Sequence, residues 1–547
     1  MDTNKLSALL FPQGTAAISE LEDRYPPRAL PEGAAVTRFA PSPTGFVHVG
    51  ALFPAIVGER LSHSSGGGSI LRIEDTDGKR RVDGAAEEIL AGLNAYGVSF
   101  DEGVCLTEGK ISERGAYGPY YQRQRVPLYH ACARFLVEQG HAYPCFCSED
   151  KLSAMRQKQE SEKANFGYFG PWAACRDLSL PEIGEKLDRG TPYVLRLKSP
   201  GRPGQKIVLD DLARGRLELP ENDIDHVLLK CDGVPTYHFA HAVDDHFMRV
   251  THVVRGDEWL ATYPLHHQLF GLLGFRRPKY VHLAPLMKLE ESSRRKLSKR
   301  KDPEAALRYY AEKGYPRAAL REYIMTLLNS NYEDWRRGHP DDDISAFPFS
   351  VKKLGSQGPL FDLDKLHDVC RNTVSRMAAE DIYEQAAEWC RRFCPDFGLV
   401  WTRTPEYARR ILSIGRGGKK PRRDITLWKD IPSYADFFYA DRFVSYAGLP
   451  AGLSREDYTA VLSAYRELYD PNDDMQTWFR KIRDMGEGLG FCPDVKAYKN
   501  NPSGWKGSVA DVSMALRVAV TGREMSPDLH ECMRILGKDV VLERIKI

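Results

Sequence analysis

The sequence carries little net charge and has no long apolar segment. Its 77 lysines and arginines nearly balance its 75 aspartates and glutamates, which leaves a formal charge of +2 over 547 residues. A nucleic-acid partner would therefore bind local basic patches rather than a uniformly basic surface. No apolar run is long enough to cross a bilayer, and residues 1–11 lack the charged start and apolar body of a secretion signal. These absences predict a cytoplasmic protein with no membrane partner.

The composition is otherwise that of a large globular protein. Hydrophobic residues make up 42% of the chain and charged residues 28%, which excludes the disordered and fibrous classes. At this length we expect roughly three or four domains. The 11 cysteines are an odd number, and in a chain without a secretion signal we expect them to be reduced.

A strand, a loop and a helix are predicted around the first of two notable motifs. Residues 35–39 are mostly apolar, as in a buried strand, and the Pro-Ser-Pro-Thr-Gly segment at 41–45 then interrupts regular structure. From His48 apolar residues recur at helical spacing, until the Ser-Ser-Gly-Gly-Gly segment at 64–68 ends the helix. Residues 69–73 again have the character of a strand. The pattern predicts a βαβ unit.

The predicted helix begins at the motif His48-Val49-Gly50-Ala51. Its unpaired backbone N–H groups and positive dipole end would face the preceding loop, an arrangement that binds phosphate. Gly45 and Gly50 let a ligand approach the backbone, and His48 can donate a hydrogen bond to a phosphate oxygen. A lone histidine at such a place is more often a capping or core residue, so the functional interpretation depends on a second motif.

The second motif is Lys296-Leu297-Ser298-Lys299-Arg300, within a run of six cations over residues 294–301. Charge runs usually form solvated surfaces, and by itself this motif is equally well explained as a surface patch. The interruption by Leu297 and Ser298 is typical of a loop that brings a lysine onto a phosphorus atom as negative charge develops there. Together the two motifs predict cationic arms that close on the phosphates of one ATP.

Several segments are similar, in order, to the signature segments of a known family. They are Arg38-Phe39-Ala40-Pro41-Ser42-Pro43-Thr44-Gly45, Arg72-Ile73-Glu74-Asp75-Thr76-Asp77, Asp232-Gly233-Val234-Pro235-Thr236-Tyr237-His238, Val243-Asp244-Asp245-His246, Val254-Arg255-Gly256-Asp257-Glu258 and Lys296-Leu297-Ser298-Lys299-Arg300. On these segments the chain resembles the class I aminoacyl-tRNA synthetases, and among them the ligases specific for glutamate. The resemblance covers about residues 34 to 330, whereas the remainder is similar only in length and helical character.

The resemblance implies a fold and a domain order. We expect an α/β fold with a doubly wound parallel, Rossmann-like nucleotide-binding domain, an α/β insertion and an all-α C-terminal region. The expected parts are an extension at 1–33 that wraps the surface, the catalytic domain at 34–120 and 223–310, an inserted domain at 121–222 that binds the tRNA acceptor end, a helical stem-contact domain at 311–375 and a helical anticodon-binding domain at 376–547.

The resemblance also implies roles for single residues. Arg38 and Arg255 would hold the carboxylates of glutamate, since a guanidinium offers a planar fork, and Glu74 would bind the ammonium. The implied glutamate pocket comprises Arg38, Ser42, Glu74, Tyr237, His241 and Arg255. The implied ATP site comprises Thr44, His48, Gly50, Glu258 and Lys299, with Mg²⁺ sharing the phosphate charge, and His48, Lys296 and Lys299 are the implied catalytic residues.

Two departures from the family pattern stand out. The family usually continues with Gly-Gly-Ala-Arg in the first helix, where this chain has Gly50-Ala51-Leu52-Phe53 and so lacks a basic residue. His241 replaces an expected asparagine near Tyr237, which bears on how the substrate side chain is recognised. Glutamine specificity is disfavoured, because glutamine ligases have Pro-Glu-Pro-Asn-Gly where this chain has Pro-Ser-Pro-Thr-Gly at 41–45.

One group of cysteines bears on metal binding. Some family members bind structural zinc near the position of Cys145, Cys147 and Cys175, and thiolates suit zinc. The fourth ligand is not obvious, because Asp177 stands where a histidine would be more convincing. Cysteines in an apolar strand also pack as small hydrophobes, and we favour that interpretation over zinc.

The second half of the chain is predicted to be helical and to contact tRNA. Apolar residues at helical spacing predict helices over 305–313, 318–328, 377–393 and 454–468. Cations gather around glycines between 409 and 423, which suits either phosphate binding or an ordinary exposed loop. The candidate tRNA-binding residues are Lys230, Arg416, Lys419, Lys420 and Arg422.

The sequence thus predicts ATP-dependent attachment of L-glutamate to the 3′ end of glutamate tRNA by a monomeric enzyme. Glutamylation of a modified base in tRNA and tRNA-independent nucleotidyl transfer remain alternatives, although both usually lack so long a helical region after residue 311. A binding protein that kept the fold without activity is a third alternative, which the presence of His48 and Lys299 disfavours.

Overall fold

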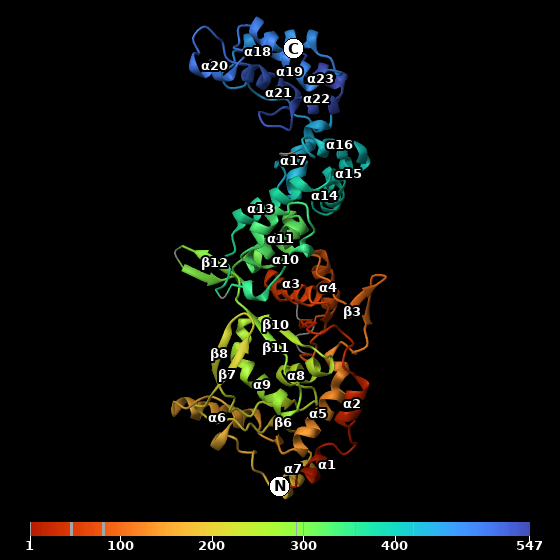
Figure 1. The fold of residues 1–547 in the computed structure, drawn as a ribbon, viewed down its shortest axis with the longest axis vertical. Helices are drawn as coiled ribbons and strands as arrows, with labels where there is room; N and C mark the ends of the chain where they lie inside the picture. Colours follow the sequence, from red (N-terminus) through yellow and green to blue (C-terminus); the bar gives the residue numbers. More distant parts are fainter. Residues whose placement is uncertain are drawn as a thin grey trace. The chain divides into compact units, whose positions relative to one another are not determined.

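The structure is a computed structural model that describes residues 2–43, 48–78, 82–291, 293–298, 300–355, 357–418 and 421–546. Thr44, Lys299, Lys419 and Lys420, which the sequence assigns to ATP or tRNA, lie outside the described residues. The chain forms two compact units (Figure 1). The first comprises residues 1–307 and 321–362, and the second residues 308–320 and 363–547.

A large mixed sheet organises the first unit. Its strand order is β4 (Lys110–Arg114), β3 (Glu102–Thr107), β2 (Gly68–Leu71), β1 (Val36–Phe39), β10 (His252–Gly256), β11 (Lys279–Leu283), β7 (Lys206–Asp211) and β8 (Gly215–Pro220). The strands from β3 to β7 run parallel, whereas β4 and β8 pair antiparallel to their neighbours. The order β3-β2-β1-β10-β11 is that of a doubly wound nucleotide fold, as the sequence predicts.

Helices cover this sheet. α3 (Val49–Ser64) packs on β1, β2 and β10, and α4 (Ala85–Ala95) packs on β3. α8 (Tyr237–Phe247) and α9 (Tyr263–Leu272) pack on each other. The central strands are buried almost throughout, which explains why they read as apolar runs rather than as alternating patterns. The carboxyl ends of β1 and β10 meet where the strand order reverses, which is where such sheets bind ligands.

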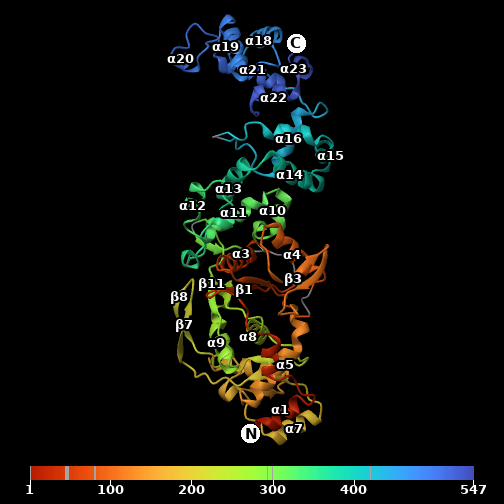
Figure 2. The same ribbon diagram turned by 45° about the vertical axis from the view of Figure 1, so that its right-hand side comes forward.

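The chain between the two sequence halves of the large sheet contributes strands to two different sheets. α5 (Val126–Glu138), β5 (Ala142–Cys145), α6 (Glu149–Ser161), α7 (Leu180–Asp188), β6 (Val194–Leu197) and β9 (Val227–Leu229) include a second, antiparallel sheet in the order β5-β6-β9. The β7–β8 hairpin instead extends the large sheet, with Asp211 registered against Tyr280 of β11, and it lies beside β11 in Figure 2. Residues 206–220 therefore belong structurally to the large sheet.

The N-terminal residues form part of the first unit. α1 (Thr3–Leu10) and α2 (Ile18–Arg24) pack against α5. Tyr25 is 1% exposed and donates its hydroxyl to the carbonyl of Gly118 at 3.0 Å. Arg28 pairs with Glu102 of β3 and donates to the carbonyl of Met248. A single residue at the end of the extension thus connects a strand to the end of α8.

A β-hairpin and several helices follow the large sheet along the chain. β12 (Met287–Glu290) pairs antiparallel with β13 (Ser293–Lys296), and α12 (Tyr332–Gly338) belongs to the same unit. α10 (Leu307–Lys313) and α11 (Arg317–Leu328) occur where the chain passes from one unit to the other.

The second unit is helical throughout its described residues, as predicted. It contains α13 (Leu363–Arg376), α14 (Ala379–Phe393), α15 (Pro395–Arg403), α16 (Pro405–Ser413), α17 (Ile431–Ala435), α18 (Arg455–Leu468), α19 (Met475–Gly488), α20 (Val495–Asn500), α21 (Val509–Thr521), α22 (Leu529–Leu536) and α23 (Lys538–Arg544). The side chain of Ser454 accepts a hydrogen bond from the backbone N–H of Asp457, which caps α18. Trp401 is fully buried in the core of this unit.

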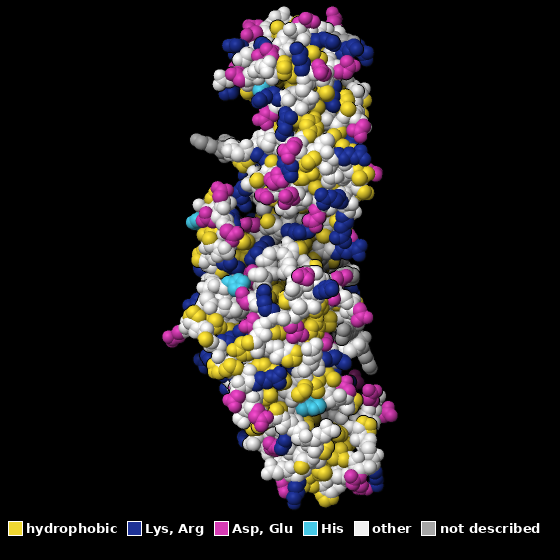
Figure 3. All heavy atoms as spheres, turned by 90° about the vertical axis from the view of Figure 1, so that its right-hand side faces the viewer, with side chains coloured by type: hydrophobic (Ala, Val, Ile, Leu, Met, Phe, Trp, Pro, Cys, Tyr) yellow, Lys and Arg dark blue, Asp and Glu magenta, His cyan; other side chains and the backbone are white. Residues whose placement is uncertain are grey.

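The surface mixes charges of both signs. On the face shown in Figure 3, lysine and arginine side chains are interspersed with aspartate and glutamate in each unit. This distribution agrees with the formal charge of +2. Among the described residues, no helix has the length and apolar character that crossing a membrane requires.

Candidate active site

A cavity of about 1090 Å³ lies in the first unit, beyond the carboxyl ends of the central strands. The segment after β1, the start of α3, the start of α8 and the end of β10 all contribute to its wall. His48 and Gly50 of the first motif line this cavity together with Lys296, Leu297 and Ser298 of the second. The structure therefore brings the described parts of both motifs to one cavity, although Lys299 itself lies outside the described residues.

The first motif forms the N-terminus of α3. His48 has the extended backbone of an N-cap residue, and it pairs with Ala306 in an isolated antiparallel bridge. A Cβ atom added to Gly50 would lie 3.0 Å from Nδ1 of His48, so the ring occupies the space above this glycine. The motif therefore combines a helix N-terminus with an imidazole held beside it, the arrangement expected for an anion site.

The second motif is anchored by a buried carboxylate. Asp302 is 2% exposed and accepts hydrogen bonds from both terminal nitrogens of Arg295, at 2.6 and 2.7 Å. It also accepts from the backbone N–H of Ser298 at 2.8 Å and from Nζ of Lys288 at 3.3 Å. The Arg295 guanidinium holds the pKa of Asp302 well below its ordinary value. One cation of the basic run, Arg295, is thereby anchored, while Lys296 faces the cavity.

Lys296 lies close to the segment that follows β10. Its Nζ is 3.7 Å from Oε2 of Glu258, and both side chains line the cavity. A Cβ atom at Gly256 would lie only 2.4 Å from that carboxylate, so only glycine fits there in this arrangement. Because both partners are more than half exposed, the pair contributes little to stability.

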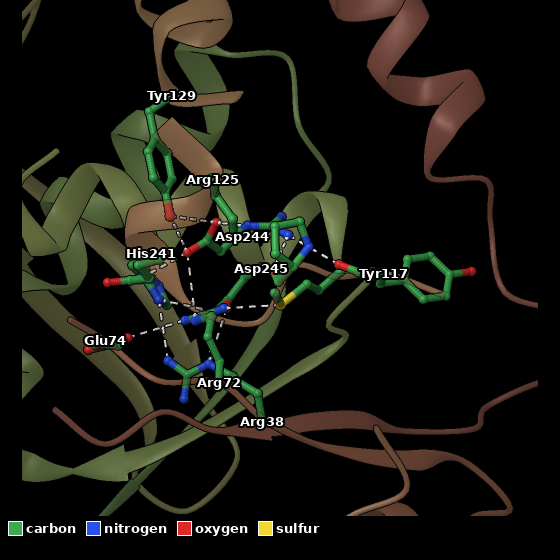
Figure 4. A network of polar contacts seen from close by, with 12 residues as sticks. Arg38, Arg72, Glu74, Tyr117, Arg125, Tyr129, His241, Asp244 and Asp245 are labelled. Atoms are coloured by element: carbon green, nitrogen blue, oxygen red, sulfur yellow. Dashed lines mark hydrogen bonds and ion pairs between the residues drawn. The ribbon is translucent and has the colours of Figure 1, made fainter. Parts of the chain in front are cut away.

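The cavity wall also carries the buried Arg38, which shares a carboxylate partner with the fully buried Arg72. Arg38 is 6% exposed, and its Nε donates to both carboxylate oxygens of Asp245, at 3.0 and 3.2 Å. Asp245 also accepts from Nη1 of Arg72 at 2.6 Å, and its Oδ2 lies 3.0 Å from Nδ1 of His241 (Figure 4). The positive neighbours Arg38 and Arg72 hold the pKa of Asp245 well below its ordinary value, against the opposing effect of its complete burial.

A second buried carboxylate continues this network. Asp244 accepts from Nε of Arg125 at 2.6 Å, from the hydroxyl of Tyr129 at 2.9 Å and from the amide of Gln122 at 2.9 Å. These side chains are all buried (Figure 4). Removing one partner of such a buried ion pair costs about 3–5 kcal/mol, because it leaves a charge uncompensated. The network therefore holds the second half of α8 in place.

Glu74 is the buried acid of the cavity wall. It is 6% exposed, and Nη2 of Arg72 donates to it at 3.3 Å. Burial raises its pKa to about 7, although Arg72 and Arg38 oppose this effect. Tyr237, also on the wall, packs against Trp259 with ring centroids 4.4 Å apart and the rings tilted by 31°. An acid poised to ionise beside two guanidiniums and an aromatic wall can bind a zwitterion with an acidic side chain.

His241 differs from its predicted place. It is fully buried, and among the described residues it is not part of the cavity lining. Its Nε2 is hydrogen-bonded to the hydroxyl of Tyr280 at 2.8 Å, and its Nδ1 lies 3.0 Å from Asp245. Burial lowers its pKa to about 3, so the ring is neutral. The sequence placed His241 against the substrate, whereas its position on the inner face of α8 directs it behind Arg38.

The other predicted residues are distributed as follows. Ser42, Arg255 and Glu258 line the cavity, and so does Lys230, whose Nζ donates to the carbonyl of Thr76 at 2.8 Å. Lys230, which the sequence assigned to tRNA, therefore faces the same cavity as the substrate residues.

Two predicted tRNA-binding arginines in the second unit have partners within that unit. Arg416 donates to the carbonyls of Leu412 and Val374, both at 2.6 Å. Arg422 donates to Asp424 at 2.5 Å. Both guanidiniums are used in holding the local loop, which limits what they can offer to phosphate.

The cavity wall also includes Thr76, Asp77 and Trp259, polar or aromatic residues to which the sequence assigned no role. Trp259 directly follows the Arg255-Gly256-Asp257-Glu258 segment, so its position next to a signature segment was an available signal. Thr76 and Asp77 end the Arg72–Asp77 segment, in which only Glu74 had been given a role.

The three cysteines Cys145, Cys147 and Cys175 lie together, with their sulfur atoms within 4.8 Å of one another. The hydroxyl of Tyr168 lies 3.4 Å from the sulfurs of both Cys145 and Cys147. Structural zinc takes four ligands. Asp177, which stands where a histidine would be a more convincing fourth ligand, pairs with Lys198 at 3.2 Å. The described residues therefore bring three thiol sulfurs and one phenol hydroxyl together at one place.

Comparisons with known proteins agree with this geometry. The family described as "tRNA synthetases class I (E and Q), catalytic domain" matches residues 34–337, and an "Anticodon binding domain" family matches residues 506–547. The glutamate–tRNA ligase of Acetivibrio thermocellus is 47% identical over 547 residues and covers all of both chains. The glutamate–tRNA ligase of Sorangium cellulosum is 44% identical and covers 98% of this chain and 99% of its own.

A solved structure is also similar. A glutamate tRNA ligase from Elizabethkingia meningosepticum, determined in complex with its amino acid, superimposes with a TM-score of 0.73 at 26% identity. The superposition covers 93% of this chain and 98% of that one. The matched catalytic region contains the whole cavity described above. The chain therefore belongs to the class I tRNA synthetases, within the family of glutamate–tRNA ligases.

Proposed function

We propose that this cavity attaches L-glutamate to the 3′ end of glutamate tRNA at the expense of ATP, through a glutamyl-adenylate. The observation that carries the proposal is the meeting of His48, Gly50 and Lys296 with Arg38, Arg255 and Glu74 around one cavity. Phosphate-binding groups and zwitterion-binding groups thus face the same space, as the joining of an amino acid to a nucleotide requires.

Glutamate binds at the side of the cavity formed by β1, β10 and α8. Arg38 and Arg255 receive its carboxylates, because each guanidinium offers parallel N–H groups. Glu74 receives the ammonium, and binding of that cation favours the ionised form of a carboxyl whose pKa is about 7 in the free protein. Ser42 and Tyr237 complete the pocket, and Trp259 supports Tyr237.

ATP binds over the N-terminus of α3. Its phosphates lie against the helix end and His48, with Lys296 of the second motif on the wall of the same cavity. Thr44 and Lys299 are assigned to ATP from the sequence alone. Mg²⁺ bound with the triphosphate supplies further neutralisation of charge, and carboxylates such as that of Asp77 on the cavity wall are the ligand type it takes.

The reaction then proceeds in two steps. The α-carboxylate of glutamate attacks the α-phosphorus and pyrophosphate leaves, while the cationic groups of both motifs stabilise the added negative charge. The ribose hydroxyl of the terminal tRNA adenosine next attacks the mixed anhydride, and AMP leaves. No side chain acts as a covalent nucleophile, so catalysis consists of positioning and charge stabilisation.

tRNA is the partner of both units. The segment between the halves of the large sheet holds its acceptor end, and the helical second unit holds its anticodon stem and loop. The match of residues 506–547 to an anticodon-binding family supports the second assignment. It also disfavours tRNA-independent nucleotidyl transfer, for which the second unit would have no use.

The test is ATP-dependent charging of total tRNA by the purified chain. We expect acid-stable attachment of labelled glutamate to tRNA, release of pyrophosphate and no attachment of glutamine. Sensitivity of the product to mild base distinguishes an ester at the 3′ end from glutamylation of a modified base. Failure to charge with either amino acid would overturn the proposal.

A further inference from the structure

Arg255 is held in an unusual way for a buried cation. It is 5% exposed and lies at the carboxyl end of β10. Its Nε lies 2.9 Å from Nε2 of His282, its Nη1 lies 3.0 Å from Nδ1 of His266, and its Nη2 donates to the carbonyl of Trp259 at 3.3 Å. Its guanidinium also lies over the ring of Tyr280, 4.8 Å from the centroid. All four of these partners are uncharged when the histidines are neutral.

The other substrate-facing arginine is held differently. Arg38 donates directly to the carboxylate of Asp245, so that its charge is neutralised before the substrate arrives. Among the described residues, the hydrogen-bond partners of Arg255 include no carboxylate. A buried guanidinium that keeps its charge attracts an anion more strongly than one already paired, because the interior screens charge poorly. Arg255 is therefore the stronger anchor for a substrate carboxylate.

The position of Arg255 depends on the protonation state of His282. Arg255 and His282 are registered neighbours on the parallel strands β10 and β11. Since Nε of Arg255 is always a donor, Nε2 of His282 must accept, which places the proton of this neutral ring on Nδ1. That Nδ1 lies 2.7 Å from Oδ2 of Asp211. Burial lowers the pKa of His282, which agrees with a neutral ring.

Asp211 is itself held firmly. It is 4% exposed, and its Oδ1 accepts from the backbone N–H groups of Ala213 and Arg214 at 2.9 and 2.8 Å. Its Oδ2 accepts from the backbone N–H of His282 at 3.1 Å as well as from the ring. The carboxylate is therefore a fixed acceptor that selects one tautomer and one orientation of His282.

We propose that Asp211 and His282 are positioning residues for glutamate binding, which hold the guanidinium of Arg255 in place through a neutral imidazole and so leave its charge for the substrate carboxylate. A carboxylate in direct contact would fix the arginine equally well but would neutralise it. The intervening ring keeps the negative charge of Asp211 one residue away. This inference rests on the function proposed above.

The same contacts connect the β7–β8 hairpin to the substrate site. Asp211 ends β7, and Arg214 in the turn of the hairpin donates to Asp257 at 2.9 Å, two residues after Arg255. The hairpin belongs by sequence to the segment between the two halves of the sheet. Its packing against β11 therefore sets the orientation of the arginine that binds glutamate.

The first test is Asp211→Asn, which keeps the shape of the side chain. The amide oxygen can still accept from the backbone N–H groups of Ala213 and Arg214. The amide nitrogen would then face the ring and the backbone N–H of His282. The ring must then accept at Nδ1, so Nε2 carries the proton and meets the N–H of Arg255. We expect the KM for glutamate to rise by about tenfold to a hundredfold, the range for a lost hydrogen bond to a charged group, with the KM for ATP unchanged.

Asp210→Asn is the matched control. Asp210 is the preceding residue of β7, carries the same charge and is exposed. We expect it to leave both KM values within twofold of those of the unmodified protein. Circular dichroism and thermal unfolding of each variant establish that the fold is retained.

A pair of substitutions at His282 tests the direction of the hydrogen bond independently of Asp211. His282→Gln places an amide oxygen near the position of Nε2 and can still accept from Arg255. His282→Asn reaches only the position of Nδ1 and leaves Arg255 without this acceptor. We expect the asparagine variant to have the higher KM for glutamate, by at least fivefold.

A double substitution separates positioning from a general structural role. In the Arg255→Lys background there is no guanidinium for Asp211 and His282 to orient. We therefore expect Asp211→Asn to change the KM for glutamate less than twofold in that background. The inference is overturned if Asp211→Asn behaves like Asp210→Asn, if it raises both KM values equally, or if the two His282 variants are indistinguishable. Absence of glutamate charging by the unmodified protein would instead refute the proposed function.

Discussion

The raised pKa of Glu74 makes glutamate binding dependent on pH in a way that can be calculated. Its carboxyl has a pKa of about 7 in the free protein, compared with an ordinary value of 4.5, because it is buried. Below pH 7 most molecules therefore carry a neutral Glu74, which cannot pair with an ammonium ion. When glutamate binds, its ammonium favours the ionised form, so binding must release a proton.

The size of the effect follows from this pKa. If the ammonium keeps Glu74 ionised in the complex, the affinity falls by about tenfold between pH 8 and pH 6. At pH 6.5 about three quarters of the free protein carries the proton, so binding releases about 0.8 proton per glutamate. His241, His266 and His282 do not contribute, because burial lowers the pKa of each of these rings.

The same shift has a consequence for stability. The folded protein binds more protons at Glu74 than the unfolded chain does between pH 4.5 and 7, so this group's contribution is fully present below 4.5 and is lost as the pH rises through 7. Relative to Glu74→Gln, which does not titrate, the protein should lose about 3 kcal/mol of unfolding free energy across this interval.

Titration calorimetry of glutamate binding measures the proton release directly. Binding enthalpies at pH 6.5 in buffers of different ionisation enthalpy give the number of protons released. We expect the Glu74→Gln variant to bind glutamate at least tenfold more weakly and to release no protons on binding. Glu258→Gln, a control at another carboxylate of the cavity, should release as many protons as the unmodified protein. Equal proton release by the protein and its Glu74→Gln variant would refute this account of the site.

Four further substitutions test other parts of the cavity. Arg255→Lys should raise the KM for glutamate by about tenfold or more in charging assays, because an ammonium cannot reproduce a bidentate fork; an unchanged KM would contradict the assignment. Lys299→Ala should lower the rate of charging by about a hundredfold or more with no change in thermal unfolding, and a normal rate would remove it from the mechanism. Gly50→Ala should displace the ring of His48 and raise the KM for ATP more than that for glutamate, and equal changes in both constants would argue against a phosphate role for this ring. Asp245→Asn should lower the unfolding free energy of the first unit by about 3 kcal/mol, as measured by urea denaturation, since two buried guanidiniums lose a partner; a loss below about 1 kcal/mol would show that the pair is not rigidly buried.

The parts of the fold with strong local signals could be predicted from the sequence. The helix predicted from His48 is α3, with His48 as its N-cap, and the helix predicted over 454–468 begins after the cap residue Ser454. Apolar periodicity and capping residues are local, so a single sequence contains them. The sequence also predicted that the two motifs line one cavity, because each offers groups that bind the phosphates of a triphosphate.

Features that depend on long-range packing could not be predicted. The β7–β8 hairpin was assigned to the inserted segment, yet β7 pairs with β11, about 70 residues later in the chain. His241 was placed against the substrate because it stands where the family pattern has an asparagine near Tyr237. The burial of that face by Tyr280 and Arg38 depends on strands far away in the sequence. Asp211 gave no signal, since its role appears only when β7 lies beside β11.

The hairpin at 206–220 sets a limit on how this chain can be shortened. β8 lies at one end of the large sheet, and β7 covers the edge of β11. Deleting the whole segment between the two parts of the catalytic domain, residues 121–222, would remove both β7 and β8. β11 would then become an edge strand whose unpaired N–H and C=O groups face solvent. Such bare edges pair with one another, so a truncated version is expected to aggregate unless these fifteen residues are retained.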